Sequence, residues 1–470
     1  MILENRSKSP SHLIASSTCE KDEEGAMNIT AIKENASGQQ ERDCYSYTPT
    51  IERIVSDWNI QEAANAVKSN KGAPGIDGMT IEEIDEYLMN KWPAVREAIL
   101  SGTYSPQAVR NVEIDKPDGS GIRELGIPTV PDRMIQQAIL QEIVYVFEAT
   151  FSDYSYGFRP GRSAHQAVKQ AQVYLKEGYD WVVDIDLEKF FDRVNHDMLM
   201  ARVARKVKDK RILLLIRSYL KAGVMKNGLV SQSDEGTPQG GPLSPILSNI
   251  LLTDFDKELE RRGHKFCRYA DDCNIYVKTE KAGERVMSSL TNFLTKKLKL
   301  KVNPHKSAVD RPWNRKFLGF SFTRGKNPMR VKIHESRIRR FKDKVKRHCR
   351  HFKSKNVATT IEKHLMPYIR GWINYYSLAE ARTIVKELDS WVRRRIRAGL
   401  WRMWKKPKSR IKNLMKLKVS KEDAKRMAHS CKGPWRLSKT EAMHKALSNK
   451  MLRAMGLVPM MEIIASLSKV

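Results

Sequence analysis

The amino-acid sequence predicts an α+β fold in which helices cover one face of an antiparallel sheet. Between about residues 107 and 322, segments of strand composition alternate irregularly with segments of helical periodicity. Within this region, two short runs rich in aromatic and β-branched residues, 265–269 and 273–277, are separated by a tight connection, which predicts a hairpin. Beyond about residue 330 only helical patterns remain, so we expect a helical domain to follow the sheet region.

The net charge narrows the class of protein. The chain of 470 residues contains 85 Lys and Arg against 54 Asp and Glu, a net charge of +31. Such an excess predicts a polyanionic partner, either nucleic acid or an anionic membrane. No apolar run is long enough to span a bilayer, and the amino terminus lacks the apolar core of a secretory signal. The six cysteines form no C-x-x-C pair, which argues against a zinc ribbon. We therefore expect an intracellular nucleic-acid-binding protein.

The predicted elements follow one another along the chain. Residues 1–45 are polar with few large apolar side chains, so we expect them to be disordered. A helical period covers 52–69, and 107–130 has the pattern of strand, turn, strand. The next helix is expected to have Asp132 as its N-cap, directly after Pro131. Later helices are expected over residues 187–207, 246–263 and 282–300.

Two pairs of carboxylates lie at the ends of predicted strands. Asp184 and Asp186 share one face of the apolar strand 181–186, because side chains repeat every two residues. Asp271 and Asp272 lie at the tip of the hairpin, where Asp is also a favourable turn residue. Acids rarely end a buried strand unless they are paired or bind a metal. If the two strands are neighbours, the carboxylates converge and require a hard cation such as Mg²⁺.

The chemistry that converging carboxylates favour is nucleotidyl transfer. Two metal ions at such a site would stabilise the attacking and leaving oxygens of an in-line displacement. Spacing alone leaves Asp184 ambiguous between a metal ligand and a structural acid. Four other acids lie on predicted helices and are interpreted as surface or capping residues: Asp192, Asp197, Asp254 and Asp256.

Several motifs resemble those of reverse transcriptases encoded in group II introns. YADD at 269–272 and DIDLEKFFD at 184–192 resemble the two motifs that carry the catalytic acids, and GTPQGGPLSPILSNI at 236–250 resembles the loop at the template and nucleotide. Further segments resemble the fingers, later palm and thumb motifs: 116–139, 154–168, 303–307, 316–320, 371–376 and 393–410. The resemblance covers about residues 50–460. It implies a right-hand polymerase with fingers and palm followed by an α-helical thumb.

The resemblance divides the chain into four parts. They are the disordered tail at 1–45, fingers and palm at 46–328, the helical thumb or maturase domain X at 329–410, and a small basic helical segment at 411–470, suited to DNA binding. Members of this family often carry a carboxy-terminal H-N-H nuclease with paired cysteines, and this sequence has no such pairs. The resemblance is therefore to the nuclease-lacking, bacterial class C type.

The resemblance also assigns roles to individual residues. Asp186, rather than Asp184, matches the first acid of the catalytic, metal-binding triad, which Asp271 and Asp272 complete. The main-chain carbonyl of Leu187 matches a further metal contact. The residues that match contacts to the incoming dNTP are Lys116 and Arg123 at the triphosphate, Phe191 under the sugar, Gln239 and Gly240 beside the nucleotide and template, and Lys306 near the leaving pyrophosphate. Phe190 is the better candidate for the core, and Lys306 is also compatible with an ordinary surface charge.

A basic run near the end of the thumb region predicts a nucleic-acid-binding surface. It contains no acid and nine cations: Arg393, Arg394, Arg395, Arg397, Arg402, Lys405, Lys406, Lys408 and Arg410. Basic side chains neutralise phosphates and make binding depend on salt. The interleaved tryptophans, and Trp372 with Tyr375 and Tyr376, are interpreted as mainly core residues because helical spacing places them on apolar faces.

Together, these observations and the resemblance predict an RNA-directed DNA polymerase encoded by a mobile group II intron. It would use two Mg²⁺ ions and dNTPs to copy an RNA template from a DNA primer, and it would bind target DNA during retrohoming. As a maturase, it would also bind its intron RNA and assist splicing, in the bacterial cytoplasm near the nucleoid. Two alternatives stay open: an RNA-binding splicing cofactor without polymerase activity, and a reverse transcriptase recruited to a defence system.

Overall fold

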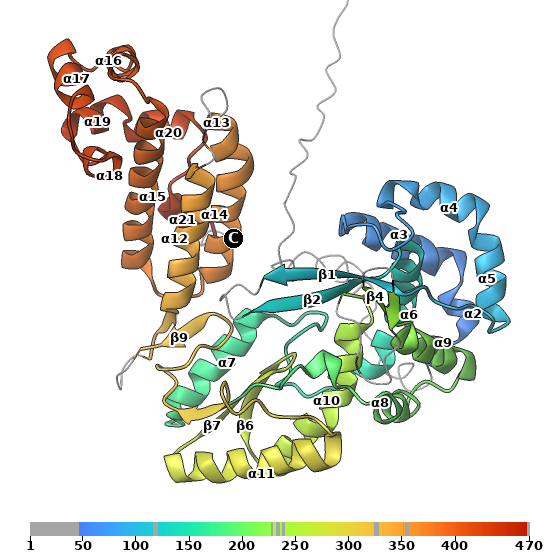
Figure 1. Ribbon diagram of the computed structural model, residues 1–470. Helices are drawn as coiled ribbons and strands as arrows, with labels where there is room; N and C mark the ends of the chain where they lie inside the picture. The colour runs from blue at the N-terminus through green and yellow to red at the C-terminus, as the bar shows by residue number, and fades with distance from the viewer. Residues whose placement is uncertain are drawn as a thin grey trace, which may run out of the picture. The chain divides into compact units, whose positions relative to one another are not determined.

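The computed structural model describes residues 47–115, 121–226, 229–231, 236, 240–323, 329–350, 352 and 357–467. The tail at 1–45, which we expect to be disordered, lies outside these residues. The described chain separates into two compact units, one ending at Arg315 and the other beginning at Lys316 (Figure 1). Residues 316–323 therefore belong to the second unit, whereas the resemblance ends the palm at residue 328.

Short helices open the first unit. They are α2 (Ile51–Ile54), α3 (Asp57–Ser69), the 3₁₀ turn η2 (Ile81–Glu83), α4 (Ile84–Asn90) and α5 (Trp92–Leu100). The period expected over 52–69 is thus divided between α2 and α3. The buried amide of Asn59 donates to the carbonyls of Ile54 and Ala138. These bonds attach the junction between α2 and α3 to the long helix α6 (Val130–Glu148).

A four-stranded sheet, which we call the β1 sheet, lies next in the chain. In spatial order it contains β2 (Ile122–Ile127), β1 (Val109–Asp115), β4 (Val224–Lys226) and β5 (Leu229–Ser231). β1 and β2 form the antiparallel pair that the sequence predicts, while β1 and β4 run parallel. Arg123 lies opposite Ile114, close to the connection between β1 and β2.

The helix α6 begins earlier than we predict from the sequence. Thr129 is its N-cap, and the Thr129 hydroxyl oxygen accepts a hydrogen bond from the N–H of Asp132. Pro131 occupies the first turn, where a missing N–H removes no helical hydrogen bond. The assignment of Asp132 as N-cap is therefore wrong. Its carboxylate instead accepts from the Thr129 hydroxyl and from the N–H of Gln107.

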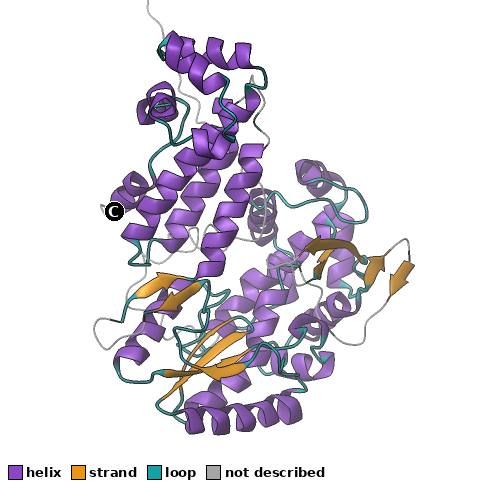
Figure 2. Ribbon diagram, turned by 60° about the vertical axis from the view of Figure 1, so that its left-hand side comes forward, coloured by secondary structure: helices purple, strands orange, loops and turns teal. Residues whose placement is uncertain are grey.

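A second four-stranded sheet, which we call the β3 sheet, is antiparallel throughout, as the sequence predicts. In spatial order it contains β6 (Lys265–Tyr269), β7 (Asp272–Val277), β3 (Trp181–Ile185) and β8 (Ala308–Asp310). The helix α11 (Glu280–Leu298) lies along one face (Figures 1 and 2). Gly283 allows the close approach, because a Cβ there would lie 2.5 Å from the side chain of Val309.

Four further helices complete the first unit: α7 (Ala164–Lys176), α8 (His196–Val203), α9 (Lys210–Lys221) and α10 (Ser244–Arg261). The single helix predicted over 187–207 is wrong, because the chain first forms a 3₁₀ turn, η3 (Phe190–Asp192). Lys189, with a φ of 48°, has a left-handed backbone that prevents a continuous helix. The helix restarts at Asn195, whose side chain accepts from the N–H of Met198.

The second unit begins with a short antiparallel hairpin, β9 (Phe320–Phe322) and β10 (Val331–Ile333), and is otherwise helical. Its helical elements are α12 (Glu335–Arg350), α13 (Val357–Thr360), the π-helical turn η4 (Ile361–Leu365), α14 (Met366–Tyr376), α15 (Arg382–Met403), α16 (Pro407–Lys416), α17 (Lys421–Ala428), α18 (Pro434–Leu437), α19 (Glu441–Ala446), α20 (Asn449–Ala454) and α21 (Met460–Leu467). None of the described helices combines the length and apolarity that a membrane-spanning segment needs.

Aromatic side chains form the core at the base of the second unit. The ring of Phe341 lies 4.5 Å from that of Trp372, which in turn lies 4.8 Å from Tyr376. Phe320 from the hairpin packs 5.2 Å from the same tyrosine. Trp401 is also buried. The interpretation of Trp372, Tyr376 and Trp401 as core residues is confirmed.

Candidate active site

The acidic hairpin tip lies at one end of the β3 sheet. β6 and β7 form the predicted hairpin, with Ala270 and Asp271 as its two turn residues. β3 pairs with β7 in a register that, one step beyond the last pair, sets Asp186 opposite Asp272. Opposed residues of neighbouring antiparallel strands have Cβ atoms about 4.5–5.5 Å apart. The fold therefore brings the two strand-end acids side by side, with Asp271 adjacent in the turn.

Both acids lie on the face of the sheet that is turned away from α11. A Cβ at Gly283 of α11 would lie 3.5 Å from the side chains of Val183 and Val277, so these valines point toward the helix. Side chains alternate along a strand. Asp186, three positions after Val183, and Asp272, five positions before Val277, therefore belong to the opposite face.

Asp184 shares this face but has a structural partner. Both Nε and Nη2 of Arg315 donate to its Oδ2 atom, at 2.9 and 2.6 Å. The Asp184 side chain is only 13% exposed. The same guanidinium donates to the carbonyl of Lys306. The ion pair thus joins β3 to the segment after β8, which explains a buried acid in this strand without a metal.

Asp186 is held by its main chain and leaves its side chain at the surface. Its N–H donates to the hydroxyl of Ser307 at 3.0 Å, and its carbonyl accepts from the N–H of Asn303 at 2.8 Å. The carboxylate is 41% exposed, and the ammonium group of Lys306 lies 4.0 Å away. The segment 303–307, singled out in the sequence, therefore brackets this acid and supplies the cation nearest to it among the described ion pairs.

The residues that follow Asp186 differ in which of their groups face inward and which face outward. A β-bridge pairs Leu187 with Val302, and its hydrogen bonds use the carbonyl of Asp186. Because successive carbonyls along an extended chain point in opposite directions, the Leu187 carbonyl faces away from this bridge. Phe190 is buried, as expected, while its neighbour Phe191 is only partly buried and contacts it edge to face at 5.2 Å.

The donors of this site suit a hard divalent cation. Among the described residues, no three His, Cys, Asp or Glu side chains are close enough to hold a metal ion by themselves. Mg²⁺ needs only one or two carboxylates when water and substrate phosphates complete its octahedron. Asp186 and Asp272, opposed across two strands, meet that requirement.

The residues expected around the nucleotide are only partly described. Lys116 and Gln239 lie outside the described residues, and for Arg123 the structure gives the position in β2. Gly240 has a φ of 122°, and a Cβ there would lie 2.5 Å from the carbonyl oxygen of Gly126 in β2. Only glycine permits this approach, so the loop is in direct contact with the β1 sheet.

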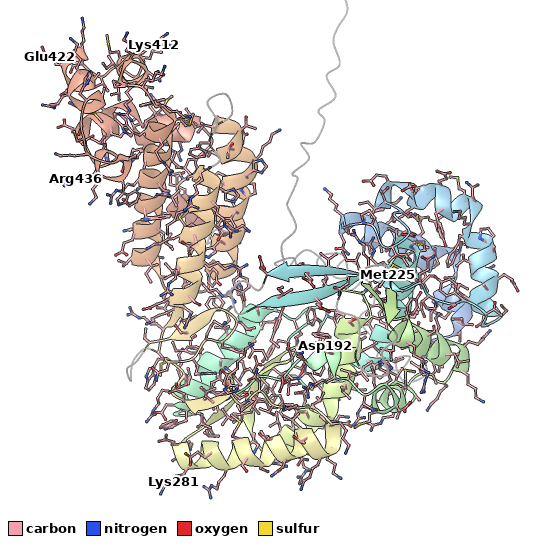
Figure 3. The ribbon with its side chains drawn as sticks, in the orientation of Figure 1. Asp192, Met225, Lys281, Lys412, Glu422 and Arg436 are labelled. Atoms are coloured by element: carbon pink, nitrogen blue, oxygen red, sulfur yellow. The ribbon has the colours of Figure 1, made fainter. Side chains whose placement is uncertain are left out.

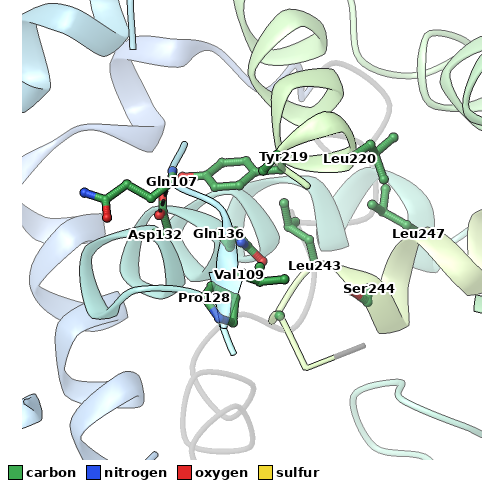
Figure 4. Close-up of a pocket in the computed structure, with 12 residues that line it drawn as sticks. Gln107, Val109, Pro128, Asp132, Gln136, Tyr219, Leu220, Leu243, Ser244 and Leu247 are labelled. Atoms are coloured by element: carbon green, nitrogen blue, oxygen red, sulfur yellow. Dashed lines mark hydrogen bonds between the residues drawn. The ribbon is translucent and has the colours of Figure 1, made fainter. Parts of the chain in front are cut away.

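A small cavity lies beside this loop, where β1, α6, α9 and α10 meet (Figure 4). Gln136 and Gly241 both line it, and a Cβ at Gly241 would meet the Gln136 amide oxygen at 2.3 Å. Asp132 also lines it and accepts a hydrogen bond from the hydroxyl of Tyr104 at 2.7 Å. Burial raises the pKa of Asp132 above its ordinary value, although its hydrogen bonds act in the opposite direction. No local sequence pattern predicts that Asp132 and Gln136 lie beside the loop.

The nine cations of the basic run fall into two groups. Arg397 is 4% exposed and donates to the carbonyl of Leu447 and the side-chain oxygen of Asn449. Burial, and then the charge of Arg393, lower the pKa of Arg397. Arg393, Arg394 and Arg410 also have internal partners, in Asp389, Trp435 and Trp404. We therefore remove Arg397 from the expected nucleic-acid surface, because its donors are used inside the unit.

Of the remaining five members of the basic run, Arg395 is half-buried and the other four are accessible. Arg402, Lys405, Lys406 and Lys408 are exposed, at the end of α15 and the start of α16. Lys412 and Arg436, which lie nearby in the chain, are likewise exposed on the outer helices of the unit (Figure 3). These side chains can reach phosphates without breaking an internal contact.

The second unit contains a cationic pocket that the sequence patterns did not lead us to predict. Arg337, Arg340 and Lys344 line it together with the rings of Tyr368, Trp372 and Tyr376. The three cations recur at helical spacing on α12, which is the signal that could have found them. Lys344 lies over the Tyr368 ring at 4.6 Å. Cations above aromatic rings suit a phosphate backbone with its bases.

Comparisons with known proteins agree with this geometry. Residues 114–322 match the family described as "Reverse transcriptase (RNA-dependent DNA polymerase)", and residues 338–418 match "Group II intron, maturase-specific domain". Protein YkfC of Escherichia coli is 35% identical over 290 residues, which cover 53% of this chain and 76% of YkfC. This chain belongs to the reverse transcriptases encoded by group II introns. It is an RNA-directed DNA polymerase by family and carries a maturase domain.

Other relatives match over smaller shares of their length. The group II intron-encoded protein LtrA of Lactococcus lactis subsp. cremoris is 38% identical over 200 residues, covering 43% of this chain and 33% of LtrA. This reverse transcriptase thus aligns with about a third of LtrA. A chain of the partial Cas6-RT-Cas1–Cas2 complex has 23% identity and a TM-score of 0.34, over 52% of this chain and 42% of that one.

The two family matches cover different parts of the fold. The reverse transcriptase match contains the whole β3 sheet with its acids, which we call the palm sheet, together with β2, β4, β5 and the last residues of β1. The maturase match runs from within α12 to just past α16, and it contains the exposed lysines and every residue of the cationic pocket except Arg337. Reverse transcriptases use divalent metal ions, which agrees with the oxygen donors at the hairpin.

Proposed function

We propose that this reverse transcriptase polymerises DNA on an RNA template with two Mg²⁺ ions held by Asp186, Asp271 and Asp272. One observation carries the proposal: the strand register sets Asp186 opposite Asp272, while Asp184 on the same face is bound to Arg315. When bound, the two metals would stabilise the attacking and leaving oxygens of the transfer. The carbonyl of Leu187, turned away from its β-bridge, is the proposed additional metal contact.

The proposed roles of the other residues follow from charge and position. Lys306, with its ammonium 4.0 Å from Asp186, would donate a proton to the leaving pyrophosphate. Phe191, which is only partly buried, would sit under the sugar and exclude a 2′-hydroxyl group. Lys116 and Arg123, the latter in β2, would bind the triphosphate. Gln239 and Gly240 would contact the nucleotide and template, and Gly240 is packed against β2.

The proposed partners extend beyond primer and template. We propose that the exposed cations of the maturase domain bind the parent intron RNA for splicing, and that residues 411–470 bind target DNA. The same proposal extends to the bacterial class C type that the motifs resemble, acting in the bacterial cytoplasm near the nucleoid. The domain limits of 46–328 and 329–410 belong to the same proposal.

The experiment is primer extension on poly(rA)/oligo(dT) with Mg²⁺, together with splicing of the cognate intron. We expect the native protein to extend, and the double variant Asp271→Ala/Asp272→Ala to splice but not extend. The matched control is Asp153→Ala/Asp197→Ala, which removes two exposed acids of the same unit that pair with Arg162 and Arg217. This control should retain both activities.

Three results would contradict the proposal. Extension by the double variant at the native rate would show that the hairpin acids do not hold the metals. No extension by a well-folded native protein would favour the splicing cofactor without polymerase activity. Loss of splicing in the double variant but not in the control would contradict the separation of polymerase and maturase roles.

A further inference from the structure

A buried arginine lies directly behind the acidic turn. Arg268 in β6 is 1% exposed, and its guanidinium donates to both carboxylate oxygens of Asp256 on α10, at 2.7 and 2.5 Å. It also donates to the side-chain oxygen of Asn249 at 3.0 Å and to the main-chain carbonyl of Ala270 at 2.8 Å. One side chain therefore connects helix α10 to the turn that carries Asp271.

The turn has a conformation that its sequence does not favour. Of its two central residues, only Ala270 has a positive φ, of 57°. A positive φ at the first central position is the pattern of a type II′ turn, where glycine is preferred. An L-residue is strained there, and such backbone persists only when surrounding contacts determine it. The hydrogen bond from Arg268 to the Ala270 carbonyl is such a contact.

A second segment fixes the turn from another side. The main chain of Arg268 exchanges hydrogen bonds with residues 154–156, at 2.9 and 2.8 Å. The next residue, Gly157, lies so close that a Cβ there would be 2.4 Å from the nitrogen of Ala270. The side-chain amide of Asn249 accepts from Arg268 through its oxygen, and its nitrogen donates to the Gly157 carbonyl at 2.8 Å. The network is thus closed around the turn.

We infer that Arg268, held by Asp256 and Asn249, is a positioning residue that fixes the turn and so sets Asp271 and Asp272 for catalysis. This inference rests on the function proposed above for those two acids. The plain alternative is a buried ion pair that only packs α10 against β6. The two differ in one respect: positioning predicts an altered dependence on the metal ion, whereas packing predicts altered stability alone.

The test compares two arginines that pair with the same helix. Arg268→Lys keeps the charge but loses the fork that reaches Asp256 and the Ala270 carbonyl together. The control is Arg202→Lys, because Arg202 of α8 pairs with Asp254 on α10 at 2.8 Å and otherwise donates to the carbonyl of Met198 in its own helix. Both variants are assayed as full-length protein for extension rate against Mg²⁺ and dNTP concentration, RNA affinity and thermal melting.

We expect Arg268→Lys to lower the maximal extension rate about 10-fold or more, because small displacements of catalytic groups are costly. The Mg²⁺ concentration for half-maximal rate should rise several-fold, while the KM for dNTP and the RNA affinity stay within about 2-fold. Arg202→Lys should keep the native Mg²⁺ dependence. A folded Arg268→Lys protein with native Mg²⁺ dependence would overturn the inference. If that variant does not fold, Asp256→Asn, which weakens the ion pair with Arg268, provides the same comparison.

The turn itself offers an independent check. Ala270→Gly removes the strain of the positive φ, so in the Arg268→Lys background it should recover part of the lost rate and Mg²⁺ affinity. In the native background it should change little. Equal, additive effects in both backgrounds would contradict a link between Arg268 and the turn. Absence of extension by the native protein would instead refute the proposed function, which separates the two failures.

Discussion

At the scale of single residues, Asp184 and Asp186 show how one strand face carries acids with different tasks. They are two positions apart, and spacing cannot distinguish them. The difference comes from Arg315, which binds Asp184 from a segment more than a hundred residues later in the chain. Asp186 has its carboxylate at the surface and only its main chain fixed.

We therefore predict opposite outcomes for two equivalent substitutions. Asp184→Asn should lower the free energy of unfolding by roughly 1.5–3 kcal/mol, because it weakens charge-assisted hydrogen bonds to Arg315. Its extension rate per folded molecule should stay near the native value. Asp186→Asn should abolish extension with little loss of stability. Urea unfolding and primer extension on the same samples measure both, and loss of extension in a folded Asp184→Asn protein would contradict the assignment.

Sequence reasoning identified the acids of the hairpin but misread Asp256. We interpreted Asp256 as a surface or capping acid, and that is wrong, because it is fully buried. A signal existed: helical spacing places it on the apolar face of α10 with Leu252 and Leu259. Its partner Arg268 lies on a different element, and pairing between elements cannot be read from local patterns. The roles of Asp186, Asp271 and Asp272 themselves stay predictions.

At the scale of elements, Asp209 joins the start of α9 to the start of α2. Its carboxylate accepts from the N–H of Arg211 at 2.9 Å as the N-cap of α9, and from the N–H of Ile51 at 3.0 Å. Burial alone would raise the pKa of Asp209, but the hydrogen bonds from Arg211 and Ile51 hold it below its ordinary value. The ionised form is therefore the one that holds these elements together.

This linkage predicts how stability depends on pH. A lowered pKa contributes stability that is complete above the unfolded value of about 3.9 and is lost as the pH falls through the folded value. Asp209→Asn should be less stable than the native protein by about 1 kcal/mol at pH 7. The difference should shrink as the pH falls below about 4. Urea unfolding from pH 7 to 3 measures it, and a difference that grows toward acid would refute the linkage.

The elements themselves were predictable where a strong local pattern exists. The hairpin of β6 and β7, the pair β1 and β2, and helices α10 and α11 lie close to the ranges that the sequence predicts. The helix expected over 187–207 failed because a left-handed residue, Lys189, and a new N-cap, Asn195, divide it. The N-cap of α6 is Thr129 rather than Asp132, since both are good caps and Pro131 is tolerated in the first turn after Thr129.

At the scale of the molecule, the charge of +31 is distributed over two units with different tasks. The α+β class and the family were predictable because many motifs, spread over most of the chain, agree with one another. The contacts of Lys116 and Gln239 stay predictions. The outer cations of the maturase domain could not be separated from its inner ones by sequence, because burial depends on the packing of segments such as α18 and α20 against α15.

The exposed lysines predict a salt dependence for binding of the intron RNA. Replacing Lys405, Lys406 and Lys408 by Gln should weaken binding and reduce the slope of log affinity against log salt by about 0.7–0.9 for each phosphate that is no longer neutralised. A matched control replaces Lys281, Lys296 and Lys297 of α11, which are equally exposed but lie on the helix behind the palm sheet (Figure 3). Filter binding across salt concentrations measures both. Equal changes in the two triple variants would show a non-specific charge effect.

The central place of β3 in the palm sheet bears on how the chain is made on the ribosome. β3 lies between β7 and β8, yet β8 starts at Ala308, 123 positions after β3 ends at Ile185. At about 5–20 residues per second, β3 emerges roughly 6 to 25 s before β8. For most of that interval, until β7 has been made, an apolar strand has both edges unpaired, a state prone to aggregation. The nascent polymerase is therefore expected to depend on chaperones in this window, well before its thumb has been translated.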